Sequence, residues 1–160
     1  MTMKLTGVGS LAARTLRALG CDNLAKRLTG YSSHDALVAR TARKLVSADT
    51  NGRLYVDHHH CTPAGAANTR GADVGTWQQH VPDVVYTRFD SHSLVIEVER
   101  ESSLDTHAAS QLADFVSPSY QPVLVVPRPD HRERARNFLK RHNLATSVTL
   151  AHPYTITEQL

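Results

Sequence analysis

Hydrophobic and polar positions follow helical and strand periods from residue 32 onward. Apolar residues at helical spacing predict a helix that Ser32 or Ser33 caps and that runs to about Ser47. Two further helices are expected over residues 106–116 and 130–142, the second capped by Asp130. Alternating or continuous apolar runs predict strands over residues 53–57, 84–88, 94–99, 122–126 and 147–150.

The order of these elements predicts an α/β fold. Three strands joined by turn signals at residues 51–52 and 90–92 come first, and a strand–helix–strand unit follows. The strand at 122–126 is short, apolar and β-branched, which is typical of a strand buried on both faces. We therefore expect a mixed central sheet flanked by helices.

Domain boundaries are expected near both ends of the chain. Residues 1–31 are predicted to form a helical N-terminal extension, residues 32–152 the folded domain and residues 153–160 a C-terminal tail. Residues 58–80 have no clear period and are predicted to be a long loop, of a length that is often functional. The total of 160 residues fits one domain with a short appendage.

Composition excludes some classes and leaves others open. No apolar stretch is long enough to span a membrane, and two cysteines give no disulfide framework, so a cytoplasmic protein is expected. The net charge of +3 permits a polyanionic partner without establishing one.

Candidate chemistry lies in the hairpin that contains Asp83. Side chains alternate across a strand, so Glu97 and Glu99 share one face, roughly 6.5–7 Å apart. The hairpin turn places Asp83 opposite Glu97 or Glu99. Three carboxylates on one face are costly unless a cation joins them, and Mg²⁺ or Mn²⁺ favours such oxygen ligands. The alternative is a solvent-exposed face with ordinary glutamates.

The run from Pro82-Asp83 to Glu97-Val98-Glu99 resembles the PD-(D/E)XK nuclease superfamily, which includes restriction endonucleases and Holliday junction resolvases. The resemblance covers roughly residues 32–150 and implies the restriction-endonuclease-like αβββαβ core. It implies that Asp83 and Glu97 bind Mg²⁺ together with the backbone carbonyl of Val98. Glu99 occupies the position of the usual lysine.

Two further residues agree with the resemblance. Some nuclease branches carry a glutamine where Gln111 lies, and many place an extra acidic ligand on the first helix, where Asp35 lies. Asp35 is alternatively an ordinary acidic residue that stabilises a helix N-terminus, and Gln111 a polar surface residue.

The activity implied by the resemblance is metal-dependent hydrolysis of a DNA phosphodiester by a homodimer, with Glu99 orienting water as a general base or binding a second ion. Basic residues near the site would offset the repulsion between DNA and the carboxylates. These candidates are Arg40, Arg43, Lys44, Arg70 and Arg100. The many cations of the helix over residues 130–142 are interpreted as a solvated face.

Two other functions remain open. Loss of the lysine allows a catalytically inactive nucleic-acid-binding or assembly protein that keeps the fold. The run from Asp57 to Cys61, with His80, allows a zinc-stabilised scaffold, although its spacing fits no standard zinc motif. Asp57 or His59 is instead expected beside the acidic face, in contact with the metal ligands or with a phosphate. Tyr55 and Trp77 are expected in the core, with base stacking as the alternative.

Overall fold

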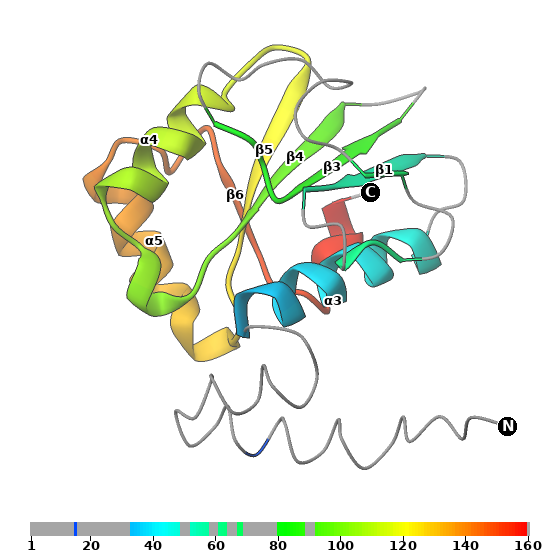
Figure 1. The fold of residues 1–160 in the computed structure, drawn as a ribbon. Helices are drawn as coiled ribbons and strands as arrows, with labels where there is room; N and C mark the ends of the chain where they lie inside the picture. The colour runs from blue at the N-terminus through cyan, green and yellow to red at the C-terminus, as the bar shows by residue number, and fades with distance from the viewer. Residues whose placement is uncertain are drawn as a thin grey trace, which may run out of the picture. The chain divides into compact units, whose positions relative to one another are not determined.

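The computed structural model of the protein describes residues 15, 33–48, 52–57, 61–63, 67–68, 80–88 and 92–159 (Figure 1). Two compact units divide the chain, Met1–Ala36 and Leu37–Leu160. The predicted N-terminal extension lies outside the described residues except for Thr15. In the part of the chain that the structure describes, no helix has the length and apolarity needed to cross a membrane.

A mixed sheet with the strand order β2-β1-β3-β4-β5-β6 forms the centre of the second unit. This confirms the expected α/β class. The strands are β1 (Arg53–Val56), β2 (Ala67–Asn68), β3 (Val84–Thr87), β4 (Ser93–Val98), β5 (Tyr120–Val125) and β6 (Thr149–Ala151). The helices are α3 (Ser33–Ala48), α4 (Thr106–Asp114) and α5 (Arg132–Arg141). Short 3-10 helices are η2 (Glu101–Ser103), η3 (Pro129–His131) and η4 (Ile156–Gln159).

The directions of the strands bring the ends of several strands to the same end of the sheet. β1, β3 and β4 form an antiparallel meander, whereas β4, β5 and β6 run parallel through the crossovers that contain α4 and α5. The carboxyl ends of β4, β5 and β6 therefore lie at the same edge, together with the beginning of β3.

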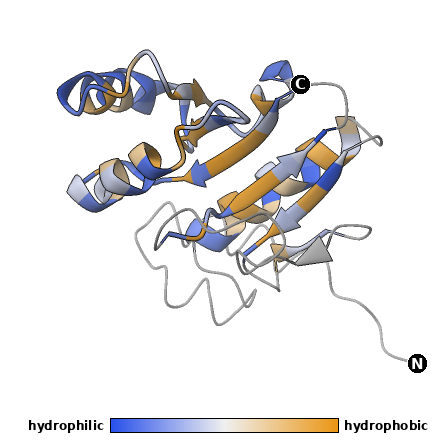
Figure 2. Cartoon of the chain, turned by 90° about the horizontal axis from the view of Figure 1, so that it is seen from above, coloured by the Kyte–Doolittle hydropathy of each residue, from blue (hydrophilic) through white to orange (hydrophobic). Residues whose placement is uncertain are grey.

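Both faces of the sheet are covered, by α3 on one side and by α4 and α5 on the other (Figures 1 and 2). Leu94, Ile96 and Val98 are at most 1% exposed on one face of β4. On the opposite face, Val85 and Val95 pack with Phe115, and α4 and α5 pack over Leu124 and Val126. Residues 123–125 of β5 and Val126, which directly follows it, are fully inaccessible to solvent. This confirms the prediction that this strand is buried on both faces. The Glu97 face is thus also a core face near the middle of the sheet.

Helix termini and short strands differ from the sequence predictions. Asp130 was predicted to cap the third helix, but it lies in η3 beside Arg128, and α5 begins at Arg132 with no side-chain cap. Asp105 instead caps α4 by accepting hydrogen bonds from the backbone N–H groups of His107 and Ala108. The two-residue strand β2 lies inside the segment predicted to be a loop.

Residues that follow β6 are folded against the rest of the second unit. Ile156 in η4 is fully buried, and the side chain of His152 is 7% exposed. The segment predicted to be a C-terminal tail thus contributes to the core.

Candidate functional site

Three carboxylates are buried at the end of the β3–β4 hairpin. Asp83 is 7% exposed, Glu97 5% and Glu99 9%. The alternative of a solvent-exposed face with ordinary glutamates is therefore wrong. A charged group loses its hydration when it is buried. A buried carboxylate at this position therefore stays ionised only if other interactions compensate for that loss.

Strand register explains how residues distant in the sequence meet. Val84 pairs with Ile96, so continuing the antiparallel register places Asp83 opposite Glu97. On the other side of β3, the backbone N–H of Asp57 donates to the Asp83 carbonyl at 3.1 Å, which continues the pairing of β1 with β3. Asp57, Asp83 and Glu97 therefore form a row across three neighbouring strands on one sheet face.

The Asp83 side chain is fixed by the backbone of β4. Its Oδ2 atom accepts a hydrogen bond from the Val98 N–H at 2.9 Å. In an extended strand the N–H and C=O of one residue point to the same side, so the Val98 carbonyl is expected to face β3 as well. The three groups that the sequence predicted as metal ligands, on Asp83, Glu97 and Val98, thus belong to adjoining strand ends.

The Glu97 carboxyl has a pKa raised well above its ordinary value of 4.5. Burial is the largest cause, followed by repulsion from the carboxylates of Asp83 and Glu99, with a smaller contribution from Asp57. A hydrogen bond with the Asp83 backbone acts in the opposite direction. Among the described residues, no cationic side chain contributes to lowering this pKa.

An unsatisfied oxygen makes the site suitable for a hard cation. Glu97 Oε2 is buried and has no hydrogen-bond partner. A divalent ion would satisfy this oxygen and offset the repulsion among the carboxylates. Within the described ranges, no group of three or more His, Cys, Asp or Glu side chains is arranged to hold a metal ion. Mg²⁺ in proteins commonly takes one or two carboxylates and completes its shell with water and phosphate oxygens.

Glu99 lies two residues beyond Glu97, immediately after the end of β4. Its backbone N–H donates to the Val125 carbonyl at 2.9 Å, so the strand geometry continues through this position. Glu99 therefore shares the face of Glu97, as the sequence predicted. Its contribution to the raised pKa of Glu97 shows that the two carboxylates interact electrostatically.

The two accessory candidates, Asp35 and Gln111, have different surroundings in the structure. Asp35 belongs to the first unit, Met1–Ala36, where its Oδ1 atom lies 3.7 Å from His34 Nδ1. Gln111 is half-buried on α4, and it does not appear among the groups that act on Glu97.

The basic candidates lie in separate places. Arg40, Arg43 and Lys44 are on α3, and Arg100 hydrogen-bonds to Ser102 in η2. Arg70 lies outside the described residues.

The zinc alternative depends mainly on residues 58–60, which lie outside the described residues. Cys61 is a buried thiol. The other predicted ligand, His80, places Nδ1 2.7 Å from Asp114 Oδ2, and its ring centroid is 5.4 Å from that of His107.

Of the two aromatic residues for which base stacking was the alternative, Tyr55 packs against the cluster of Val85, Val95 and Phe115. This confirms the expectation that it is a core residue. Trp77 is outside the described part of the chain.

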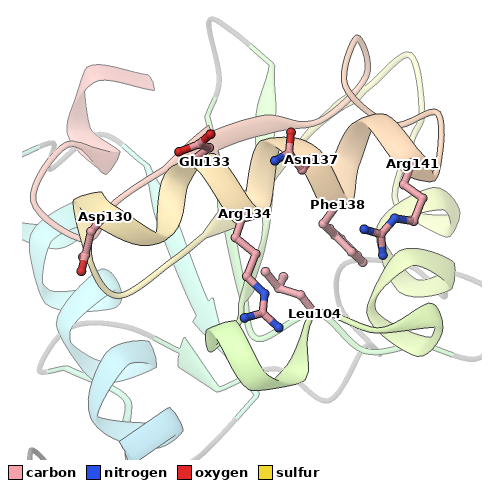
Figure 3. Close-up of a pocket in the computed structure, with 7 residues that line it drawn as sticks. All are labelled: Leu104, Asp130, Glu133, Arg134, Asn137, Phe138 and Arg141. Atoms are coloured by element: carbon pink, nitrogen blue, oxygen red, sulfur yellow. The ribbon is translucent and has the colours of Figure 1, made fainter.

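An open cavity of about 510 Å³ lies along α5 (Figure 3). Its lining combines Arg134, Asn137 and Arg141 with acidic groups, and Arg134 pairs with Glu101 at 2.6 Å. None of the three buried carboxylates lines this cavity. The ion pair and the exposed position of Arg134 agree with the interpretation of this helix as a solvated, mixed-charge face.

One exposed aromatic residue beside two cations was not predicted from the sequence. Tyr154 was placed in the predicted C-terminal tail, but it is 56% exposed and contacts two cations of α3. Only the position of an aromatic residue beyond the last strand could have drawn attention to it, because the contacts join residues more than 100 positions apart in the chain.

Comparison of the chain with protein-family models, with curated proteins and with solved structures gives no match.

Proposed function

We propose that this protein is a metal-dependent DNA endonuclease that hydrolyses phosphodiester bonds with Mg²⁺ or Mn²⁺. The observation that carries this proposal is the buried Glu97 carboxylate, whose Oε2 has no hydrogen-bond partner and which faces Asp83 across the hairpin. Two buried carboxylates without a cation repel each other and have lost their hydration. A hard divalent cation bound between them offsets both costs.

The arrangement of elements supports the proposal. A helix, an antiparallel three-strand meander, a crossover helix and a parallel strand follow one another. Asp83 directly precedes the second strand of that meander, and Glu97 lies on the third. This is the order that the resemblance to the PD-(D/E)XK superfamily implies, and Asp83 and Glu97 occupy its two acidic positions.

In the proposed reaction, Asp83 and Glu97 hold the ion, and the Val98 N–H keeps the Asp83 carboxylate in position. The chemistry that such an ion would supply, when bound, is Lewis-acid catalysis: a lower pKa of water and partial neutralisation of the phosphate charge. Glu99 would orient the attacking water and accept its proton, while the P–O bond to the leaving sugar oxygen breaks and that oxygen takes a proton from solvent water. The chain lacks a lysine at this position, so cations elsewhere must offset the phosphate charge.

A second function is favoured by that same departure at Glu99. If the lysine position is essential for cleavage, the protein binds nucleic acid or assembles with a partner without cutting it. Buried carboxylates would then remain as a metal-stabilised structural feature.

The decisive experiment compares supercoiled, linear and branched DNA with and without Mg²⁺ or Mn²⁺. We expect metal-dependent cleavage by the wild-type protein and a loss of about 100-fold or more in Asp83→Asn and Glu97→Gln, because each removes a metal ligand. Glu133→Gln is the matched control, since it makes the same chemical change at an exposed position of α5. Undiminished cleavage by either ligand variant would rule out the assigned site, and binding of DNA without any cleavage would favour the second function.

A further inference from the structure

Tyr154 forms an exposed aromatic surface flanked by cations. The ring centroid lies 5.6 Å from the guanidinium carbon of Arg40 and 5.6 Å from Nζ of Lys44. Arg40 and Lys44 are one helical turn apart on α3, so both side chains project from the same side of that helix. Although these two side chains lie close to it, Tyr154 remains 56% exposed.

In the part of the chain that the structure describes, no acidic side chain neutralises the cations beside Tyr154. Within the described residues, neither Arg40 nor Lys44 has a carboxylate within ion-pair distance, unlike Arg134, which pairs with Glu101. The exposed Arg43 adds a third positive charge to the same helix. This surface therefore attracts anions.

His152 fixes the position of Tyr154. Its Nδ1 atom accepts a hydrogen bond from the Tyr154 N–H at 3.2 Å, and its Nε2 atom lies 2.9 Å from the Pro127 carbonyl. The tautomer with its proton on Nε2 satisfies both contacts. His152 is itself 7% exposed, and its ring centroid is 5.1 Å from that of Tyr154. The aromatic side chain is thus held by a buried neighbour.

The chain leads into Tyr154 from the same end of the sheet at which Glu99 follows β4. Val98, Val125 and Ala151 are aligned by the parallel register, so Glu99 and His152 directly follow the ends of β4 and β6. Two strand spacings separate these ends by about 10 Å.

We infer that Tyr154, Arg40 and Lys44 form a docking surface for an unpaired nucleotide of the DNA substrate. The base stacks against Tyr154, and the cations bind the flanking phosphates. Bases inside a duplex are stacked on one another and cannot reach this ring, so the preferred substrate contains a single-stranded or branched segment. This inference rests on the proposed function for the identity of the ligand, and it specifies the substrate class.

The test measures binding in EDTA, where no cleavage occurs, by fluorescence anisotropy with a short single-stranded DNA and with a duplex of the same sequence. Tyr154→Ala is expected to weaken binding of the single strand by about 5- to 150-fold and to leave duplex binding nearly unchanged, because one stacking contact is lost. Tyr154→Phe keeps the ring and is expected to bind as the wild type does.

The phosphate contacts are tested by the salt dependence of binding. Arg40→Gln and Lys44→Gln are each expected to reduce the slope of log K against log salt by about 0.7 for the single strand. Arg136→Gln is the matched control, because it removes the same charge from an exposed position on α5. Arg40→Gln and Lys44→Gln also test the docking surface if Tyr154→Ala fails to fold.

The outcomes separate this inference from the nuclease proposal. Single-strand binding that depends on Tyr154, without any cleavage in Mg²⁺ or Mn²⁺, supports the docking surface and overturns the nuclease. Wild-type binding by Tyr154→Ala, or a salt slope that Arg40→Gln and Lys44→Gln change no more than Arg136→Gln does, overturns the docking surface even if DNA is cleaved. Absence of single-strand binding by the wild-type protein overturns it as well.

Discussion

The Asp83 carboxylate accepts a hydrogen bond from the Val98 backbone N–H at 2.9 Å, and both groups are buried. This contact joins the beginning of β3 to the end of β4 and turns the Asp83 side chain toward the strand that carries Glu97. One side chain thus has a structural contact and a proposed metal-binding role.

Substitution of Asp83 separates these two roles. Asp83→Ala and Asp83→Asn both remove the charge, but only the alanine variant leaves the Val98 N–H without an acceptor. We expect Asp83→Ala to be less stable than Asp83→Asn by about 1–3 kcal/mol in urea unfolding. Asp130→Ala is the control, because its carboxylate is exposed and its loss should matter little. Equal stabilities for the two Asp83 variants would show that the hydrogen bond contributes nothing.

The raised pKa of Glu97 predicts a specific pH dependence of stability without metal. The folded protein holds this proton to higher pH than the unfolded chain does, so stability falls as pH rises above the ordinary value of 4.5 toward the raised pKa. Glu97→Gln should weaken this fall and be more stable than the wild type at neutral pH in EDTA. Thermal unfolding across this pH range measures the effect, with Glu133→Gln as the control. A wild-type pH dependence in Glu97→Gln would contradict the assignment.

Divalent cations are expected to reverse the loss of stability that the buried Glu97 carboxylate causes at neutral pH. A ligand at about 100 times its Kd stabilises a folded protein by about 2.7 kcal/mol, so Mg²⁺ or Mn²⁺ should raise the Tm of the wild type. The increase should be lost in Asp83→Asn and Glu97→Gln and should shrink at low pH, because protons compete for Glu97. Calorimetric scans with and without the ion provide the measurement. An equal increase in the ligand variants would place the cation elsewhere.

Glu99→Lys tests the position at which the chain departs from the usual motif. The change removes one repulsion from Glu97 and places an ammonium near it, so the pKa of Glu97 should fall. Metal-dependent cleavage is expected to persist or increase. NMR titration of the Glu97 carboxyl and a cleavage assay provide the measurements, with Glu158→Lys as an exposed charge control. Complete loss of cleavage in a folded variant would instead indicate that the reaction requires the Glu99 carboxylate.

Gly52 is expected to tolerate no larger residue. A Cβ atom there would collide with the ring of Tyr86, which is 1% exposed in the core. Gly52→Ala should therefore lower the free energy of unfolding by about 1–3 kcal/mol, as overpacking does in other cores. Chemical denaturation measures the loss, and unchanged stability would mean that Tyr86 moves aside without cost.

Local pattern was sufficient to predict most elements of the sheet. The alternation around Leu94, Ile96 and Val98 defined one core face, and the hairpin turn brought Asp83 to the level of Glu97 because antiparallel register follows from turn position. The two-residue strand β2 could not be predicted, since it depends on pairing with β1 rather than on its own composition. The capping error at Asp130 has a similar origin, because the preceding η3 turn displaced the start of α5.

The sequence by itself determined the mixed α/β class, the pairing of Asp83 with the Glu97 strand and the shared face of Glu97 and Glu99. These follow from the two-residue period of a strand and from short loops, which act over a few positions. Only the tertiary structure decided that this face is buried and that Tyr154 meets Arg40 and Lys44. Burial depends on which helix covers a face, and contacts between distant segments depend on strand order, so neither property is encoded in local periodicity.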